Sequence, residues 1–317
     1  MHIKTMSRVM VAFAAMLFAT STQADCIRAP EMDANFCDRN GDLVADLPDD
    51  SALWRNPNTL VWAYTPIEDP AVYANLFRPF TEYLSDCTGK QVVYYPVQSN
   101  AAEVAAIKSG RVHFAGFSTG PTVAAVNEGG AVPFAAKGDA DGIRGYSLVA
   151  IVRADSPYHN LSDLEGKRVA HSTPLSNSGN IAPRALFPAE DLVPGQDYEP
   201  ILSGGHDRSI LGVLAGDYDM AAVASDVLER MTKRGMLQVD DLRVIYTSAL
   251  FPTSAFVHAH DLHPKLTAQL KSCFFGFTFP PEMQQAFQGD AQFLPISYKS
   301  DWEIVRNVMD QTTLPDN

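Results

Sequence analysis

Short apolar segments alternate with amphipathic helical patterns from Leu60 onward, and this alternation constrains the fold of the 317-residue chain more than any other feature. An apolar segment at 60–64 is followed by a helical pattern over 72–87 and by predicted strands at 91–97 and 112–117. Such alternation predicts a parallel, open α/β sheet with ligand sites beyond the carboxyl ends of its strands. Pro79 lies inside the first helical pattern and is expected to kink it.

Two stretches of the chain, 107–117 and 213–223, repeat one order of features: a helix end, a stopping glycine and an apolar strand. Gly110 matches Gly216, and the residues after each strand place Gly120 opposite Asp226. One explanation is that any two αβ units look alike. The other is that the chain forms two similar lobes whose strands end with polar residues at one shared cleft.

The N-terminus is typical of a secretory signal peptide. Lys4 and Arg8 form a basic region, 9–19 is an apolar core too short to span a membrane, and small residues precede a cleavage site after Ala24. We therefore exclude residues 1–24 from the fold and expect an exported protein. Residues 25–58 are polar and rich in turns, which predicts an irregular N-terminal extension.

The cysteine count is even, which in an exported protein suggests two disulfides with three possible pairings. We favour Cys26–Cys37, which closes a short loop in the extension, and Cys87–Cys273.

The charge balance disfavours a nucleic-acid partner. Lys and Arg total 24 against 37 for Asp and Glu, so the formal net charge is −13 and the surface repels a phosphate backbone. His258, His260 and His263 lie close together in the sequence, but no His or Cys pair elsewhere completes a metal site. We expect neither a metal nor a cofactor.

Three predicted helix starts carry short polar side chains: Ser118-Thr119, Ser176-Asn177-Ser178, and His206 after Gly204-Gly205. The first turn of a helix exposes unpaired N–H groups and a partial positive charge, so these ends are suited to an anion. Serine and asparagine are also ordinary N-caps, and any one of these starts is explained by capping alone. The three together favour an anion-binding site.

An enzyme is the alternative. Gly116-Phe117-Ser118-Thr119-Gly120 matches the G-x-S-x-G nucleophile elbow between a strand and a helix. Asp226 with His258 or His260 would complete the chain order of a secreted serine hydrolase that uses Ser118. No HGG-type oxyanion loop precedes the serine.

Several motifs of the chain point to a known family. They are Arg78-Pro79-Phe80, Gly145-Tyr146-Ser147-Leu148, Asn160-Leu161-Ser162-Asp163-Leu164, Ser176-Asn177-Ser178-Gly179 and Gly205-His206-Asp207. Over about residues 60–305 the chain resembles the periplasmic phosphonate-binding proteins of ABC importers, with their phosphite- and phosphate-binding relatives.

The resemblance implies a type II periplasmic-binding fold, in which two α/β lobes joined by two crossing strands close on a ligand in the cleft. Lobe 1 would comprise 59–150 and 250–317, and lobe 2 would comprise 151–249. The segments 146–153 and 255–259 resemble the crossing strands.

The resemblance and the helix starts together predict a binding site and a function. The phosphonate head would be held by Ser118, Thr119, Ser176, Asn177, Ser178 and His206. Asp226 would take a ligand ammonium and Tyr64 would close the pocket, so the best candidate ligand is 2-aminoethylphosphonate. Asn177 and Ser254 depart from the family pattern, which keeps phosphite and phosphate as alternatives. We expect a monomeric periplasmic protein that performs no chemistry and delivers its ligand to an inner-membrane ABC permease.

Overall fold

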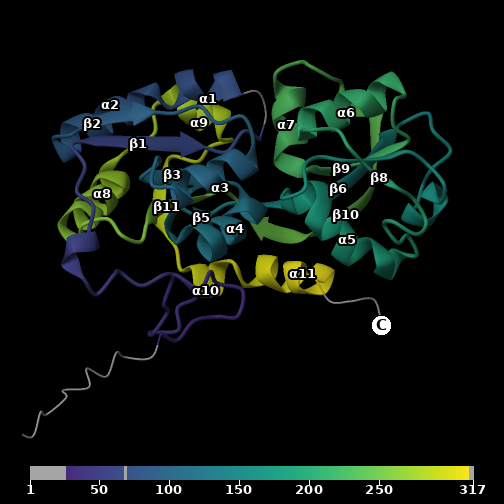
Figure 1. The fold of residues 1–317 in the computed structure, drawn as a ribbon. Helices are drawn as coiled ribbons and strands as arrows, with labels where there is room; N and C mark the ends of the chain where they lie inside the picture. The colour runs from purple at the N-terminus through teal and green to yellow at the C-terminus, as the bar shows by residue number, and fades with distance from the viewer. Residues whose placement is uncertain (1–25, 68–69, 314–317) are drawn as a thin grey trace, which may run out of the picture.

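The computed structural model describes residues 26–67 and 70–313, and the predicted signal peptide lies outside the described residues. Two β-sheets, each flanked by helices, form two lobes that lie side by side (Figure 1). Within the described part of the chain, no helix is long and apolar enough to cross a membrane.

The sheet of the larger lobe has the strand order β12-β4-β11-β3-β1-β2, with β5 paired to β4. Its strands are β1 Thr59–Tyr64, β2 Gln91–Tyr94, β3 Phe114–Phe117, β4 Ala131–Asp139, β5 Gly142–Ile143, β11 Ala255–Ala259 and β12 Gln292–Pro295. The predicted parallel pairing is confirmed for β1, β2 and β3. It is wrong for β11, which pairs antiparallel with both β3 and β4, and for β12, which pairs antiparallel with β4.

The sheet of the smaller lobe has the order β10-β6-β9-β7-β8. Its strands are β6 Gly145–Arg153, β7 Val169–His171, β8 Pro200–Leu202, β9 Met220–Ala224 and β10 Leu242–Pro252. Strand β7 is parallel to β8 and β9, while β6 pairs antiparallel with β9 and β10.

Helices cover both sheets. Those of the larger lobe are α1 Pro70–Leu76, α2 Arg78–Thr88, α3 Asn100–Lys108, α4 Thr119–Gly129, α8 Pro264–Gly276, α9 Pro281–Ala286 and α10 Tyr298–Asp301. Those of the smaller lobe are α5 Ala182–Leu186, α6 His206–Ala215 and α7 Ser225–Lys233. The C-terminal helix α11, Glu303–Thr313, contacts both α4 and α5 and so runs beneath both lobes (Figure 1).

Short helical turns complete the list of elements: η1 Ser51–Leu53, η2 Leu161–Leu164, η3 Asn177–Ile181, η4 Phe187–Glu190 and η5 Val239–Asp241. All are 3₁₀ turns except η3, which is a π-helical turn.

The predicted helix over 72–87 is broken at Phe77. Pro79 occupies the first turn of α2, where its missing N–H leaves no hydrogen bond unmade. The proline therefore separates α1 from α2 instead of kinking one helix.

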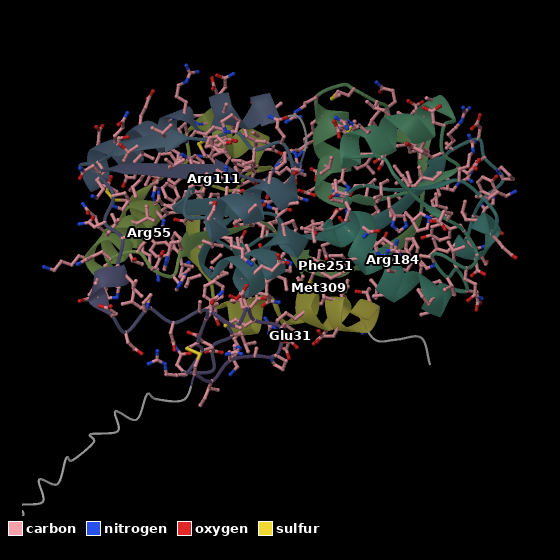
Figure 2. All side chains as sticks on the ribbon, in the orientation of Figure 1. Glu31, Arg55, Arg111, Arg184, Phe251 and Met309 are labelled. Atoms are coloured by element: carbon pink, nitrogen blue, oxygen red, sulfur yellow. A yellow bond between two sulfur atoms is a disulfide. The ribbon has the colours of Figure 1, made fainter. Side chains whose placement is uncertain are left out.

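The chain crosses between the lobes at Arg144 and at Thr253–Ser254. The predicted boundaries after 150 and before 250 fall inside β6 and β10. These two strands pair with each other from Gly145 opposite Pro252 to Arg153 opposite Leu242, and both therefore belong to the smaller sheet. Phe251, near the end of β10, lies where the lobes meet (Figure 2).

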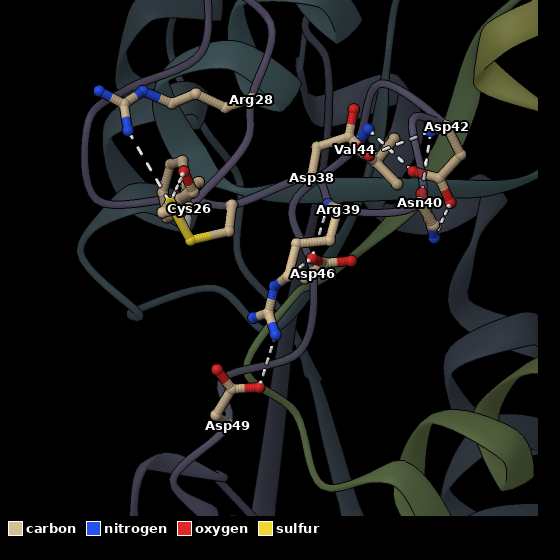
Figure 3. Close-up of polar contacts among 11 residues, drawn as sticks. Cys26, Arg28, Asp38, Arg39, Asn40, Asp42, Val44, Asp46 and Asp49 are labelled. Atoms are coloured by element: carbon tan, nitrogen blue, oxygen red, sulfur yellow. Dashed lines mark hydrogen bonds and ion pairs between the residues drawn. A yellow bond between two sulfur atoms is a disulfide. The ribbon is translucent and has the colours of Figure 1, made fainter. Parts of the chain in front are cut away.

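Residues 26–58 contain no helix or strand longer than η1. Hydrogen bonds fold this extension: the buried Asp38 carboxylate accepts from the N–H groups of Asp42 and Leu43, and Arg39 pairs with Asp46 and Asp49 (Figure 3). The predicted disulfide between Cys26 and Cys37 is confirmed, as is the one that joins Cys87 of α2 to Cys273 of α8. The second disulfide links segments of the larger lobe that lie 186 residues apart.

Candidate ligand-binding cleft

A cavity lies between the lobes, at the carboxyl ends of β1, β3 and β9 and beside both crossings. The structure brings together all eight residues that the sequence predicted for the site: Tyr64, Ser118, Thr119, Ser176, Asn177, Ser178, His206 and Asp226. The repeat noted in the sequence explains part of this arrangement. Gly110 and Gly216 each end a helix in the left-handed conformation, and the strand that follows each one leads to the cavity.

The first helix start comes from the larger lobe, where β3 leads into α4. Ser118 is the N-cap, yet its hydroxyl makes no capping bond, and its own N–H donates to Thr65 Oγ1 at 3.0 Å. The Thr119 hydroxyl donates to the carbonyl of Pro252 at 2.9 Å. The first N–H of α4 that donates within the helix is that of Thr122, to the carbonyl of Ser118. The N–H groups of Thr119 and Gly120 come before it and are available to an anion.

Thr65 connects this helix start to a buried acid. Its hydroxyl donates to Glu103 Oε2 at 2.5 Å, and burial raises the pKa of Glu103 well above its ordinary value. Glu103 lies in the first turn of α3, whose N-cap is Ser99.

The second helix start is the η3 turn of the smaller lobe, in which Ser176, Asn177 and Ser178 are all buried. Ser176 Oγ accepts from the N–H of Gly179 at 3.1 Å. A Cβ on Gly179 would lie 1.8 Å from Ser172 Oγ and 2.7 Å from Ser172 Cβ, so glycine allows Ser172 to pack this closely against the turn. A π-helical turn of this kind is frequent at functional sites.

His206, the first residue of α6, orients the Ser176 hydroxyl. Its Nδ1 accepts from the N–H of Ala224 at 3.3 Å, so the neutral ring carries its proton on Nε2. Nε2 lies 3.2 Å from Ser176 Oγ and donates to it. Ser176 Oγ then accepts from both His206 and Gly179, which leaves its own proton to be donated into the cavity.

Five residues that line the cavity carry a buried polar atom with no hydrogen-bond partner within the described residues: Asn100 Oδ1, Ser172 Oγ, Asn177 Oδ1, Thr253 Oγ1 and Asp290 Oδ1. Ser172 and Asn177 belong to the smaller lobe. Asn177 Nδ2 donates to the Tyr146 hydroxyl at 3.2 Å, and burial raises the pKa of Tyr146 to about 12, which keeps it protonated. Unpaired buried polar atoms are rare in folded proteins, and here they mark a place for a polar ligand. Sequence reasoning did not place Ser172 or Tyr146 in the site.

Asp226, in the first turn of α7, is already engaged in an ion pair. Its Oδ2 lies 2.7 Å from a guanidinium nitrogen of Arg230, one helical turn later. Burial alone would raise the pKa of Asp226, but the charge and hydrogen bond of Arg230 lower it, and the carboxyl is ionised at neutral pH.

Lys137 of β4 is the main site residue that sequence reasoning missed. It is 4% exposed, and its ammonium donates to the Tyr64 hydroxyl at 3.1 Å, which also lies 3.0 Å from Ser254 Oγ. The one signal in the sequence is a lysine that directly follows six apolar residues of the strand.

The structure does not assemble the triad of the hydrolase alternative. His258 and His260 lie outside the cavity that Ser118 lines, in a region that residues of the N-terminal extension also line. The ring centre of His260 lies 4.8 Å from that of Phe36 in this extension. Burial lowers the pKa of His258 to about 4. Among residues 26–67 and 70–313, no group of His, Cys, Asp or Glu side chains is arranged to hold a metal.

Two α/β lobes around a buried polar cavity define a cleft-type binding protein for a small ligand. The family model for the periplasmic substrate-binding protein of phosphonate ABC transporters matches residues 62–302, and the chain belongs to this family.

Individual proteins similar to this chain are consistent with this family assignment. The chain is 29% identical over 243 residues to the phosphate-import protein PhnD of Mycolicibacterium smegmatis, covering 73% of this chain and 75% of the relative. It is 25% identical to the phosphonates-binding periplasmic protein of Escherichia coli, covering 72% and 69%. The structure of PhnD1 from Prochlorococcus marinus in complex with methylphosphonate superimposes with a TM-score of 0.71 at 20% identity, covering 81% and 98%. The predicted type II periplasmic-binding fold is confirmed.

Proposed function

We propose that the cleft binds the oxyanion head of a phosphonate between the two lobes. The N–H groups that begin α4 belong to one lobe, and the η3 turn with His206 belongs to the other. The observation that carries the proposal is that two of the unpartnered buried atoms, Asn177 Oδ1 and Ser172 Oγ, belong to the same polar segment as the Ser176 hydroxyl. A protonated oxygen of a phosphonate monoanion supplies the donor that Asn177 Oδ1 lacks.

The head would be held by Ser118, Thr119, Ser176, Asn177, Ser178 and His206, as the sequence predicts. Neutral donors fixed by the backbone stabilise an oxyanion without the cost of burying a further cation. The protein then acts as the periplasmic, monomeric carrier that delivers its ligand to a membrane permease. It performs no chemistry on that ligand.

The proposal for the oxyanion head does not specify which group is attached to phosphorus. 2-Aminoethylphosphonate remains the prediction that follows from Asp226, with Tyr64 closing the pocket. Its ammonium would have to share the Asp226 carboxylate with Arg230. Phosphite, phosphate and methylphosphonate carry no ammonium and make no such demand.

Titration calorimetry on the exported chain tests the proposal with methylphosphonate, 2-aminoethylphosphonate, phosphite and phosphate. Removal of one hydroxyl that donates to an anion weakens binding about 10-fold or more, and we expect this for Ser176→Ala. Ser272→Ala, an exposed serine of α8, is the matched control. If none of the four ligands released or absorbed heat, the proposed function would be wrong.

A further inference from the structure

Lys137 has no carboxylate partner within the described part of the chain. Lys137 lines the cavity, and its one hydrogen bond goes to the Tyr64 hydroxyl at 3.1 Å. An ammonium has three N–H donors, so two remain for a ligand. A lysine that is 4% exposed and lacks an anionic partner is rare, because burying an unpaired charge is costly.

The surroundings of the Lys137 ammonium are aromatic. It lies 4.8 Å from the ring centre of Phe287, 5.4 Å from that of Tyr64 and 5.8 Å from that of Phe256. Ring faces attract a cation weakly, and they also provide an apolar surface for a short alkyl chain. They do not replace an anion.

Both acidic side chains described at the cavity are paired with other cations. Asp226 pairs with Arg230 at 2.7 Å, and Asp290 lies 3.4 Å from Arg144. Lys137 makes no ion pair of its own, although its charge acts on the carboxyls of Asp226 and Asp290 from a distance. A ligand ammonium here would meet Lys137 and Arg230 together with Asp226.

We propose that Lys137 binds a second anionic group on the ligand, so the preferred substrates are phosphonates whose alkyl substituent ends in a carboxylate. This inference rests on the proposed function, since the phosphonate head must occupy the helix starts. The carboxylate accepts from Lys137, and the alkyl chain lies against Tyr64 and Phe287. A carboxylate is favoured over an ammonium at this end of the cleft.

Calorimetry with three ligands that share one head tests the inference: 3-phosphonopropionate, 2-aminoethylphosphonate and methylphosphonate. We expect the wild-type protein to bind the carboxylated ligand more tightly than the aminated one. Lys137→Met should weaken binding of 3-phosphonopropionate about 10- to 100-fold and leave methylphosphonate within about 3-fold. Lys271→Met is the matched control, because Lys271 lies over the ring of Phe134 outside the cavity.

The outcomes separate the two proposals. Tighter binding of 2-aminoethylphosphonate by the wild-type protein, or an equal loss for all three ligands in Lys137→Met, overturns the role of Lys137 and leaves the proposed function standing. Absence of binding by all three overturns the proposed function itself. The wild-type order of affinities needs no variant, so it decides the question even if Lys137→Met does not fold.

Discussion

Gly120, in the first turn of α4, lies where the two lobes touch beside the cleft. A Cβ on Gly120 would lie 2.2 Å from the carbonyl oxygen of Leu175 and 3.0 Å from the amide nitrogen of Asn177. Both are backbone atoms of the smaller lobe, and they cannot move aside as a flexible side chain would. Gly120→Ala therefore requires the lobes to separate by about 1 Å to restore ordinary contact.

This separation should weaken ligand binding without weakening the fold. A gap of about 1 Å breaks at least one hydrogen bond from the head to one lobe, worth about 1.5–3 kcal/mol when the acceptor is charged. The expected loss of affinity is about 10- to 100-fold. Alanine is a better helix former than glycine by up to about 1 kcal/mol, so the free energy of unfolding of the ligand-free protein should stay equal or rise.

Calorimetry with methylphosphonate and urea unfolding of the ligand-free protein measure these two effects separately. Gly129→Ala is the control, because it makes the same change in the same helix and its Cβ would meet a side chain of the same lobe, that of Ile107. An unchanged affinity in Gly120→Ala would show that binding does not need the lobes this close, and the reasoning would fail.

Three further predictions concern stability and rate. Because burial raises the pKa of Glu103, the folded protein keeps a proton that the unfolded chain releases above pH 4.5. The free energy of unfolding should therefore fall as pH rises past that value. Urea titrations at several pH values measure this slope, and Glu103→Gln should flatten it. Replacing both Cys87 and Cys273 by alanine should lower the free energy of unfolding by about 2–5 kcal/mol, and a smaller loss would show that the link is dispensable. Because the net charge is −13, the protein should repel an anionic ligand at long range, and salt should screen this repulsion. Stopped-flow association should therefore become faster when salt is raised from ~10 mM to ~150 mM, and slower association would contradict long-range repulsion.

The parts of the site that lie at helix starts could be predicted from the sequence. Ser118, Ser176 and His206 each follow a strand or a glycine-rich turn, and such positions gather at one edge of an α/β sheet whatever the order of its strands. The local pattern is sufficient there. The ion pair of Asp226 with Arg230 was also readable, since residues four apart share one face of a helix.

The parts that come from strand interiors could not be predicted in this way. Lys137 faces the cavity because β4 pairs with β11 and β12, which follow more than 100 residues later in the chain. A shift of one residue in that register would turn the lysine to the other face of the sheet. Tyr146 depends in the same way on the pairing of β6 with β10.

The two ends of the cleft bind by different means, and this difference bears on specificity. At the helix starts, the donors are backbone N–H groups and short hydroxyls, whose positions are fixed by the fold and suit any tetrahedral oxyanion. At the other end, the charges belong to side chains, the cations Lys137, Arg144 and Arg230 and the acids Asp226 and Asp290, and one substitution changes the balance of charge there. The head site should therefore persist among proteins with this fold while the substituent site varies, because the first depends on backbone geometry and the second on a few side chains.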